Sequence, residues 1–182
     1  KSKSKIEALT ISFVNSYVNN SNEQKAAKIA AKIFKDIPIS ISSEVIPEMQ
    51  EYERAETTVL NSYVRPQVSK YVDNLQNSLE EKLSKDVQLS ILRSDGGLAS
   101  SRSTGESPVN HLMSGPAGGV AGAIHFCSKA GHDNILTFDM GGTSTDVALI
   151  QNSRPRLRRE TLVGDARVKA PSVDIRTVGA GG

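Results

Sequence analysis

Stretches with strand-like and helix-like spacing of hydrophobic residues succeed one another along the chain. Residues 7–18, EALTISFVNSYV, are rich in apolar and β-branched side chains and predict a buried strand. The polar run 19–22 ends it, and apolar residues then recur at helical spacing up to about Asp36, before Pro38. Residues 39–42 alternate as a short strand. The first third therefore predicts a βαβ unit with parallel strands and a right-handed crossover.

Helical spacing dominates the middle of the chain. Residues 44–84 carry two apolar stripes on either side of Pro66, which we expect to kink or break the helix because proline has no N–H donor. Residues 87–92 then alternate as a strand with one wet face, and residues 95–97 predict a turn. Residues 99–110 are polar and rich in serine, which indicates a surface loop.

The last third predicts a helix followed by strands. Ser114 and Pro116 suit the first turn of a helix that should end near Lys129, with Gly131 as its C-terminal cap. The strands expected after it lie at 135–138, 147–150 and 160–169. This mixed succession of strands and helices predicts an α/β fold with helices packed on a sheet.

The turn between two of these strands carries the most informative residues, Asp139-Met140-Gly141-Gly142-Thr143-Ser144-Thr145-Asp146. Glycines there allow positive φ angles and close approach to a ligand. Exposed N–H groups, with the hydroxyls of Thr143 and Ser144, form a cradle for an anion such as phosphate. Asp139 and Asp146 are placed to hold Mg²⁺ directly or through water. The alternative is an ordinary hairpin in which Asp139 caps the turn and Asp146 is a polar strand-end residue.

Two other glycine-rich segments are candidates for ligand binding. Ser114 and Gly115 open a helix, where a cap and an anion site are equally good readings, whereas Gly119 and Gly122 favour close helix packing on the sheet. Residues 179–182 resemble a further ligand loop, with a flexible linker as the alternative. The chain has no Walker A lysine and no Gly-x-Gly-x-x-Gly, so the P-loop and Rossmann motifs are absent.

The glycine-rich turn also resembles a known sequence. Its Asp-x-Gly-Gly-Thr resembles a phosphate loop of the actin, sugar-kinase and heat-shock-chaperone ATPase superfamily. The longer FDMGGTSTDVALI resembles the hydantoinase A/5-oxoprolinase family within it. Further stretches are similar to that family, occur in its order, and extend the resemblance from about residue 40 onward; they lie at 43–45, 51–54, 57–61, 114–120 and 178–182.

The resemblance implies an actin-like (ribonuclease H-like) ATPase fold in which ATP lies between two lobes. Residues 1–132 would form the end of the first lobe and residues 133–182 the start of the next, so that the chain is a fragment carrying one of the two phosphate loops. A first residue other than Met and a final Gly-Gly also indicate a piece of a longer polypeptide.

The resemblance also implies roles for the turn. Asp139 and Asp146 would be catalytic, and Asp139 would bind the metal. The cofactor-binding residues would be Gly141, Gly142, Thr143, Ser144, Ser114 and Gly115.

The function implied is ATP-dependent hydrolysis of a cyclic amide, a hydantoin or 5-oxoproline, with ATP and Mg²⁺ (or Mn²⁺) as cofactors. Phosphorylation of the amide oxygen makes the ring carbon electrophilic, and water then opens the ring. A second hydantoinase-type subunit or domain is the expected partner. The alternatives are an ATP-dependent ketone carboxylase subunit, a small-molecule kinase, and an actin-like switch or scaffold. We expect the fragment alone to be inactive.

Composition excludes some classes of function. A net charge of +2 and an aromatic content of 4% argue against a nucleic-acid-binding protein, and the basic cluster 154–159 is expected to be a solvated strand edge. No apolar run is long enough to cross a bilayer and no signal peptide is visible, so the cytoplasm is the expected compartment. The single cysteine, Cys127, excludes an internal disulfide and is expected to be a buried thiol in a helix.

Two further groups of polar residues have a structural and a functional interpretation. Glu51, Glu53 and Arg54 suit a solvated helix entry, with Arg54 paired to one of the glutamates, or a substrate or interlobe surface by family resemblance. The three histidines have no metal-binding spacing, so a zinc site is not expected; His111, just before the Ser114 turn, is the one that merits a test.

Overall fold

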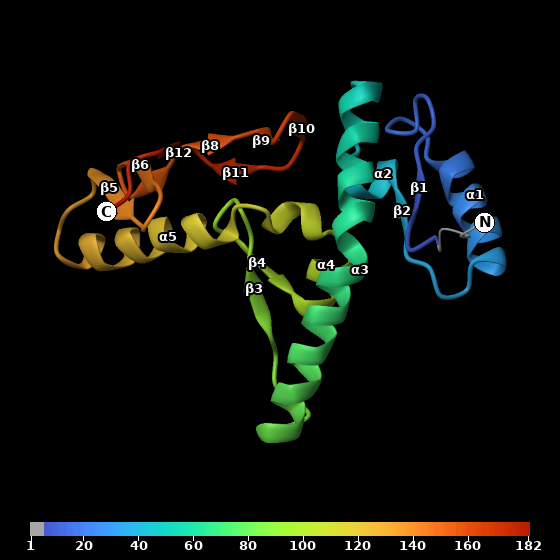
Figure 1. The fold of residues 1–182 in the computed structure, drawn as a ribbon, viewed down its shortest axis with the longest axis horizontal. Helices are drawn as coiled ribbons and strands as arrows, with labels where there is room; N and C mark the ends of the chain where they lie inside the picture. Colours follow the sequence, from blue (N-terminus) through green and yellow to red (C-terminus); the bar gives the residue numbers. More distant parts are fainter. Residues whose placement is uncertain (1–5) are drawn as a thin grey trace. The chain divides into compact units, whose positions relative to one another are not determined.

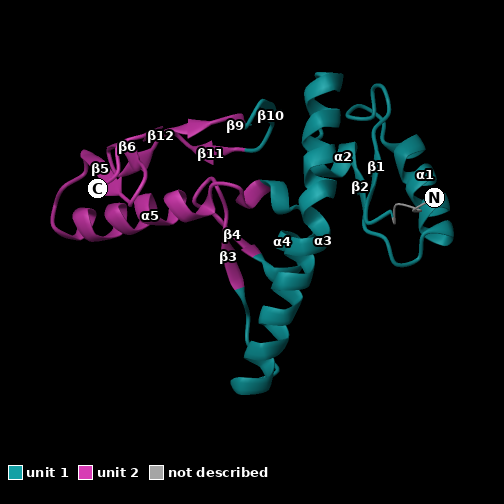
Figure 2. Cartoon of the chain, in the orientation of Figure 1, with its two compact units in different colours: residues 1–89, 100–109, 162–170 teal, residues 90–99, 110–161, 171–182 magenta. Residues whose placement is uncertain are grey.

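The computed structural model describes residues 6–182, which form two compact units that the chain enters more than once (Figure 2). Unit 1 contains the residues up to 89 together with 100–109 and 162–170, and unit 2 contains 90–99, 110–161 and 171–182. Both units combine helices and strands, which confirms the α/β class. The expected lobe boundary after residue 132 falls inside unit 2, between a helix and a strand, and the division into lobes stays a prediction.

Unit 1 begins with the predicted βαβ element. Strands β1 (Leu9–Ile11) and β2 (Ile39–Ile41) pair in parallel, and helix α1 (Ser21–Ile33) connects them. The strand pair lies between α1 and the long helix α3 (Glu51–Lys82), as Figure 1 shows. The strand expected over 7–18 is much shorter, because β2 offers only three partners and Asn15 leaves the extended region with φ +57°.

The helical stretch expected over 44–84 contains two helices, but they are not divided at Pro66. After the one-turn helix α2 (Ser42–Val45), Ile46 is extended because Pro47 follows it, and α3 starts five residues after Ile46. Helix α3 then runs through Pro66 without a break. Packing holds it on both sides of the proline: Arg65 donates to the carbonyl of Ile39 and Ser69 donates to that of Gly105, so the loss of one helical hydrogen bond is tolerated.

The prediction of a surface loop over 99–110 is wrong. The segment forms helix α4 (Ser101–Glu106) and the 3₁₀ helix η1 (Pro108–His111), and Thr104, Pro108 and Val109 are buried. The Ser100 side chain caps α4 by accepting a hydrogen bond from the Ser103 amide at 3.2 Å. Serines that look like loop residues in the sequence therefore start a helix.

The strand expected over 160–169 is divided. Strands β9 (Thr161–Val163) and β10 (Ala166–Val168) are separated by a turn in which Gly164 has φ +60°. Within unit 1, Val168 and Ala170 pack with Val109 in a small apolar core. The backbone after β10 is held on α3 by the Lys169 amide, which donates to the Thr57 hydroxyl at 2.9 Å.

Unit 2 is built on an antiparallel sheet with strand order β12-β6-β5, formed by β5 (Ile135–Met140), β6 (Thr145–Gln151) and β12 (Ile175–Val178), with β7 (Arg154–Pro155) also paired to β6. Helix α5 (Ser114–Lys129) packs on one face, which confirms the predicted helix and strand pair. The core residues are Ala117, Val120, Ala148, Ile150, Val173 and Ile175. Gly131 ends α5 with φ +82°, as predicted.

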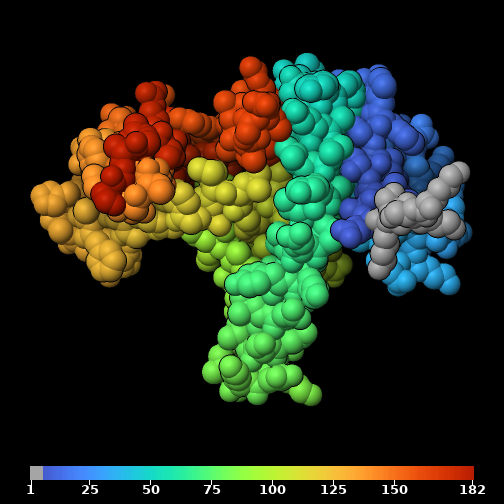
Figure 3. Space-filling model, viewed as in Figure 1, coloured from blue at the N-terminus to red at the C-terminus, as the bar shows by residue number. Residues whose placement is uncertain are grey.

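The remaining strands of the chain are short, namely β3 (Ser90–Leu92), β4 (Leu98–Ser100), β8 (Leu157–Arg158) and β11 (Ser172–Val173). The predicted turn after β3 is confirmed, with Gly96 at φ +85°. The arginines of the basic cluster 154–159 are exposed on β7, β8 and the residues around them, as expected of a solvated strand edge. In Figure 3, the last turns of α3 and the exposed residues that follow them are visible in green.

Candidate active site

The two aspartates of the glycine-rich turn face each other across a strand pair. In the antiparallel register of β5 and β6, Asp139 lies opposite Asp146, two residues beyond the pair of Thr137 and Ala148. Side chains directly opposite, and those two residues along each strand, share one face of a sheet. Because Ala148 belongs to the core under α5, both carboxylates lie on the face that α5 covers. The predicted grouping of Asp139 with Asp146 is thus present in the fold.

Helix α5 leaves a cavity beside this carboxylate pair. The cavity has a volume of about 240 Å³. Its lining residues are Pro116, Gly119, Val120, Ala123, Thr137, Phe138, Asp139, Asp146, Ala148 and Ile175. A Cβ atom at Gly119 would lie 3.6 Å from Oδ2 of Asp139, so the glycine keeps the helix side of the cavity open.

Close packing was expected at Gly119 and Gly122; it is present at Gly119, which lies against Asp139 of the sheet, and absent at Gly122, and the tightest approach is at Gly118. A Cβ atom at Gly118 would lie 3.1 Å from the Leu92 side chain, whereas at Gly122 it would meet nothing within 4 Å. Periodicity indicated that small residues matter in this helix, but it did not predict which of them contacts a neighbour.

The surroundings of the two carboxylates differ. Oδ1 of Asp146 accepts a hydrogen bond of 2.6 Å from the hydroxyl of Thr177, its cross-strand neighbour on β12. Asp139 is exposed, and its carboxylate has no ion-pair or hydrogen-bond partner among residues 6–182. Like charges placed directly opposite on a sheet destabilise it, so the pair favours a bound cation.

The turn that follows Asp139 presents unused hydrogen-bond donors. The Gly141 amide donates to the carbonyl of Ser144 at 2.8 Å and closes the turn. The amides of Gly142, Thr143 and Ser144 find no acceptor within the described part of the chain. The positive φ angles expected here are absent, since neither Gly141 nor Gly142 adopts one. A Cβ at Gly142 would meet nothing within 4 Å, so that side of the loop is open to a ligand.

The residues 179–182 lie against this loop and do not form a loose linker. The Thr145 hydroxyl donates to the carbonyl of Ala180 at 2.5 Å, and the Gly182 amide donates to that of Gly141 at 3.3 Å. The pairing of β12 with β6 places them there, because Val178 is the register partner of Thr145. Two glycine-rich segments distant in sequence therefore meet at one end of the sheet.

Ser114 and Gly115 occupy the first turn of α5 but do not line the cavity, where Pro116 and Gly119 are the nearest helix residues. The cap expected of Ser114 is also absent: Met113 is the N-cap residue, and its side chain makes no capping hydrogen bond. A Cβ at Gly115 would meet open space. A ligand role for these two residues remains a prediction.

The donor set suits a hard cation held by few protein ligands. No cluster of three or more His, Cys, Asp or Glu side chains occurs within residues 6–182, so this part of the chain would supply the two carboxylates alone. Mg²⁺ commonly binds one or two carboxylates and completes its shell with water and phosphate oxygens, and Mn²⁺ also accepts oxygen ligands. His111 is engaged elsewhere, since its Nδ1 lies 2.9 Å from the carbonyl of Leu92.

A second polar constellation, in unit 1, was not predicted. Arg54, expected on a solvated helix face, is only 1% exposed. Its Nε donates to the hydroxyl of Ser42 at 3.0 Å, and its terminal nitrogens bond the carbonyls of Glu48 and Phe13. It also pairs with Glu51, as the sequence suggested for one of the glutamates. Arg54 thus joins α3 to the segments before it.

The buried carboxylate of the same cluster is Glu23. Burial alone would raise the pKa of Glu23, but donors from Ser42, Phe13 and Ser43 outweigh it and hold the pKa below its ordinary value. The side chains of Glu23, Ser42 and Arg54 are all hydrogen-bonded, which is the mark of a structural network.

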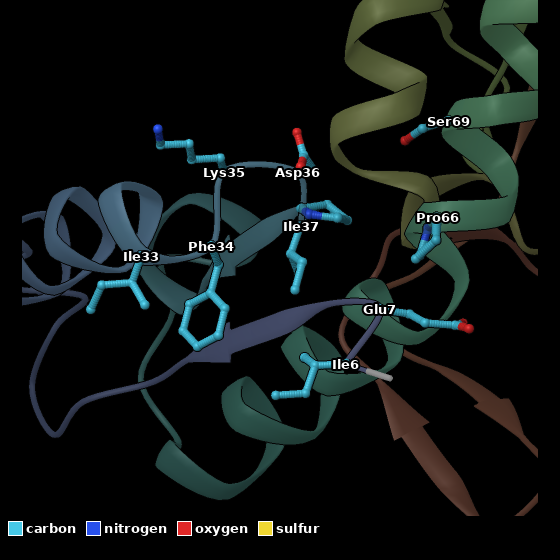
Figure 4. Close-up of a pocket in the computed structure, with 10 residues that line it drawn as sticks. Ile6, Glu7, Ile33, Phe34, Lys35, Asp36, Ile37, Pro66 and Ser69 are labelled. Atoms are coloured by element: carbon cyan, nitrogen blue, oxygen red, sulfur yellow. The ribbon is translucent and has the colours of Figure 1, made fainter. Parts of the chain in front are cut away.

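Other cavities carry less chemistry. A groove of about 1000 Å³ in unit 1 is lined by Ile6, Ile33, Phe34, Ile37 and Pro66 with a few polar neighbours (Figure 4). Cys127 is half-buried and unpaired, where the sequence predicted a buried thiol. No helix within the described residues is both long and apolar enough to cross a membrane.

Comparison with known proteins agrees with the resemblance of the motifs. The family model described as hydantoinase/oxoprolinase matches residues 54–182. Caprolactamase subunit alpha of Pseudomonas jessenii is 34% identical over 97% of this chain and 25% of its own length. The 5-oxoprolinase of Saccharomyces cerevisiae is 35% identical over 97% of this chain and 14% of its own length.

Solved structures agree in fold. The ATP-dependent caprolactamase of Pseudomonas jessenii superimposes with a TM-score of 0.81 at 34% identity, over 97% of this chain and 26% of that one. Nucleotide-free acetone carboxylase gives a TM-score of 0.81 at 29% identity, over 96% of this chain and 25% of that one. The chain thus spans about a quarter or less of these relatives. On the family match and these identities, it belongs to the hydantoinase/oxoprolinase family.

Proposed function

We propose that this chain is the phosphate- and metal-binding part of an ATP-dependent cyclic amide hydrolase of the hydantoinase or oxoprolinase type. The observation that carries the proposal is the facing pair Asp139 and Asp146 beside a loop with unused amide donors. Relatives named as an ATP-dependent caprolactamase and as 5-oxoprolinases support the reaction class. The enzyme's fold would be actin-like, with residues 1–132 ending one lobe and 133–182 starting the next.

In this proposal the loop binds phosphate. The amides of Gly142, Thr143 and Ser144, with the hydroxyls of Thr143 and Ser144, donate to phosphate oxygens. Asp139 and Asp146 hold Mg²⁺ or Mn²⁺, which neutralises the charge of the phosphates. Thr177 fixes the orientation of the Asp146 carboxylate through its hydrogen bond.

Ser114 and Gly115 would add donors from the start of α5, where the positive end of the helix dipole favours an anion.

The substrate would be a hydantoin or 5-oxoproline. Transfer of the terminal phosphoryl group of ATP to the amide oxygen would release ADP and make the ring carbon electrophilic. Water would then add to that carbon, phosphate would leave, and the ring C–N bond would break. The residues named here position phosphate and metal and need not contact the ring. A second hydantoinase-type subunit or domain would complete hydrolysis, and the relatives named as a subunit alpha and a beta subunit support such a partner. Since the reaction consumes ATP, the cytoplasm is the proposed compartment.

A second candidate is an ATP-dependent ketone carboxylase subunit. The fold similarity to acetone carboxylase favours it, and the same phosphate loop would then serve to activate a ketone oxygen. The two candidates share the site and differ in the organic substrate.

The test is ADP release by the full-length protein together with its partner subunit. Rates would be compared with hydantoin, 5-oxoproline, caprolactam, acetone with bicarbonate, and no substrate. We expect stimulation by one cyclic amide, abolished by Asp139→Ala but unchanged in Asp165→Ala, a control at an exposed aspartate outside the site. Stimulation by acetone alone would select the carboxylase, and a stable phosphorylated product a kinase. A rate indifferent to every compound would select a switch or scaffold, and absence of ATP turnover would refute the proposal.

A further inference from the structure

The glycine-rich residues that follow β12 lie in close contact with the phosphate loop, and the proposed function does not use this contact. A Cβ atom at Gly181 would lie 2.5 Å from the carbonyl carbon of Gly142 and 2.6 Å from that of Thr143, and it would overlap the Thr143 nitrogen as well. Real Cβ atoms do not approach backbone this closely, so a side chain at this position would displace one of the two segments. Gly181 therefore packs directly on the peptide between Gly142 and Thr143.

The orientation of the Gly142–Thr143 peptide is weakly fixed by its own sequence. Glycine has wide backbone freedom, so the consecutive Gly141 and Gly142 leave the following amides free to rotate. The amides of Gly142 and Thr143 are also among the donors that have no acceptor within the described residues. A loop whose donors must all point at one anion binds it better when their direction is set beforehand, because no ordering cost falls on binding.

The neighbouring contacts hold Gly181 in place from both sides. Before it, the Ala180 carbonyl accepts the hydrogen bond from Thr145, a buried residue. After it, the Gly182 amide donates to the Gly141 carbonyl, on the loop itself. The segment is thus anchored to the strand that carries Asp146 and to the turn that follows Asp139.

We propose that residues 180–182 form the second wall of the phosphate site, and that Gly181 is a positioning residue that holds the Gly142–Thr143 peptide in its ligand-binding orientation. The inference rests on the proposed function, since the ligand is the phosphate of ATP. It adds that Gly181 acts through the loop without donating to the ligand. The requirement is steric, so even one added methyl group at this position disturbs the site.

The test compares two glycines of the same segment in the full-length protein with its partner subunit. Gly181→Ala is the variant, and Gly179→Ala is the matched control, because a Cβ at Gly179 meets nothing within 4 Å and neither residue has a positive φ. We expect Gly181→Ala to raise the KM for ATP by about tenfold or more, with a smaller change in kcat, and Gly179→Ala to leave both near wild type.

A second pair of variants covers the case in which Gly181→Ala fails to fold. Thr145→Val removes the hydrogen bond to Ala180 and should raise the KM for ATP severalfold, whereas Thr145→Ser keeps the hydroxyl and should restore it. Melting temperatures measured on all variants separate loss of fold from loss of positioning.

Each outcome decides one of the two proposals. If the wild type hydrolyses ATP and Asp139→Ala does not, but Gly181→Ala has the KM of Gly179→Ala, the role of Gly181 is refuted and the proposed function stands. Equal KM values for Thr145→Val and Thr145→Ser would also count against the second wall. If the wild type neither binds nor hydrolyses ATP, the proposed function fails, and this inference fails with it.

Discussion

The buried network of unit 1 and the carboxylate site of unit 2 contain similar polar residues but differ in how completely these are hydrogen-bonded. Around Glu23, Ser42 and Arg54, donors and acceptors are paired and enclosed by the fold. Around Asp139, a carboxylate and three backbone amides are left without partners in the described residues. Buried polar groups that are paired stabilise a structure, whereas clustered unpaired groups are available to a ligand. Hydrogen-bond saturation therefore separates the structural cluster from the functional one.

The largest effect on stability is expected when Arg54 is replaced, which tests whether the network of unit 1 is structural. Arg54→Met should lower the free energy of unfolding by about 3–5 kcal/mol, because the Ser42 hydroxyl and the carbonyls of Glu48 and Phe13 would all lose their donor, at about 1–3 kcal/mol for each unsatisfied buried group. Arg54→Lys should not restore it, since one ammonium cannot replace a guanidinium that bonds several groups at once. Urea denaturation of the variants measures the effect. A loss below about 1 kcal/mol would mean that the network is not structural.

The opposite result is expected in unit 2. Asp139→Asn should reduce ATP turnover by about 100-fold or more, yet leave the melting temperature unchanged or raised, because it removes repulsion between two facing carboxylates. Steady-state kinetics and thermal unfolding of the same preparation test both halves. A large fall in melting temperature would show that Asp139 stabilises the fold and would weaken its assignment to the site.

The stability that Glu23 contributes to unit 1 should depend on pH. The folded state holds the pKa of Glu23 below its ordinary value, so it binds fewer protons than the unfolded chain. The resulting stability is present above the ordinary glutamate pKa and is lost as the pH falls through the folded value. Glu23→Gln should cost about 1–2 kcal/mol near neutral pH and progressively less in acid. Unfolding curves across pH would contradict this if the difference stayed constant.

The smallest effect is expected at Thr177. Thr177→Val removes the hydrogen bond that orients Asp146. It should raise the Mg²⁺ concentration needed for half-maximal ATP turnover by about tenfold, with little change in the stability of the fold. The conservative Thr177→Ser should behave as wild type. Titration of activity with Mg²⁺ measures the difference, and identical Mg²⁺ curves for both variants would remove Thr177 from the site.

Local patterns predicted α5 and the β5–β6 pair of unit 2, but not β12, which pairs with β6. Helix α5 and the β5–β6 pair follow from spacing within a few residues, and the short turn between the strands brings Asp139 opposite Asp146. Unit 1 was less predictable. Pro47 divides the helices, Ser100 caps a helix in what reads as a loop, and Arg54 is buried although its type is usually solvated.

The roles of Gly119 and Gly181 depend on contacts with distant backbone and side chains. No local pattern reports such contacts, so a glycine that a neighbour requires looks like any other glycine in the sequence.

Strand β12 sets the tolerance of the chain to insertions. Its pairing with β6 places Thr177 opposite Asp146 and leads the last residues past the phosphate loop. A slip of one residue would turn Thr177 to the other face and bring Arg176 opposite Asp146. Natural variants of this family are therefore expected to vary in length at exposed turns such as the one around Gly164, while the stretch from Ile175 to Gly182 keeps a constant number of residues.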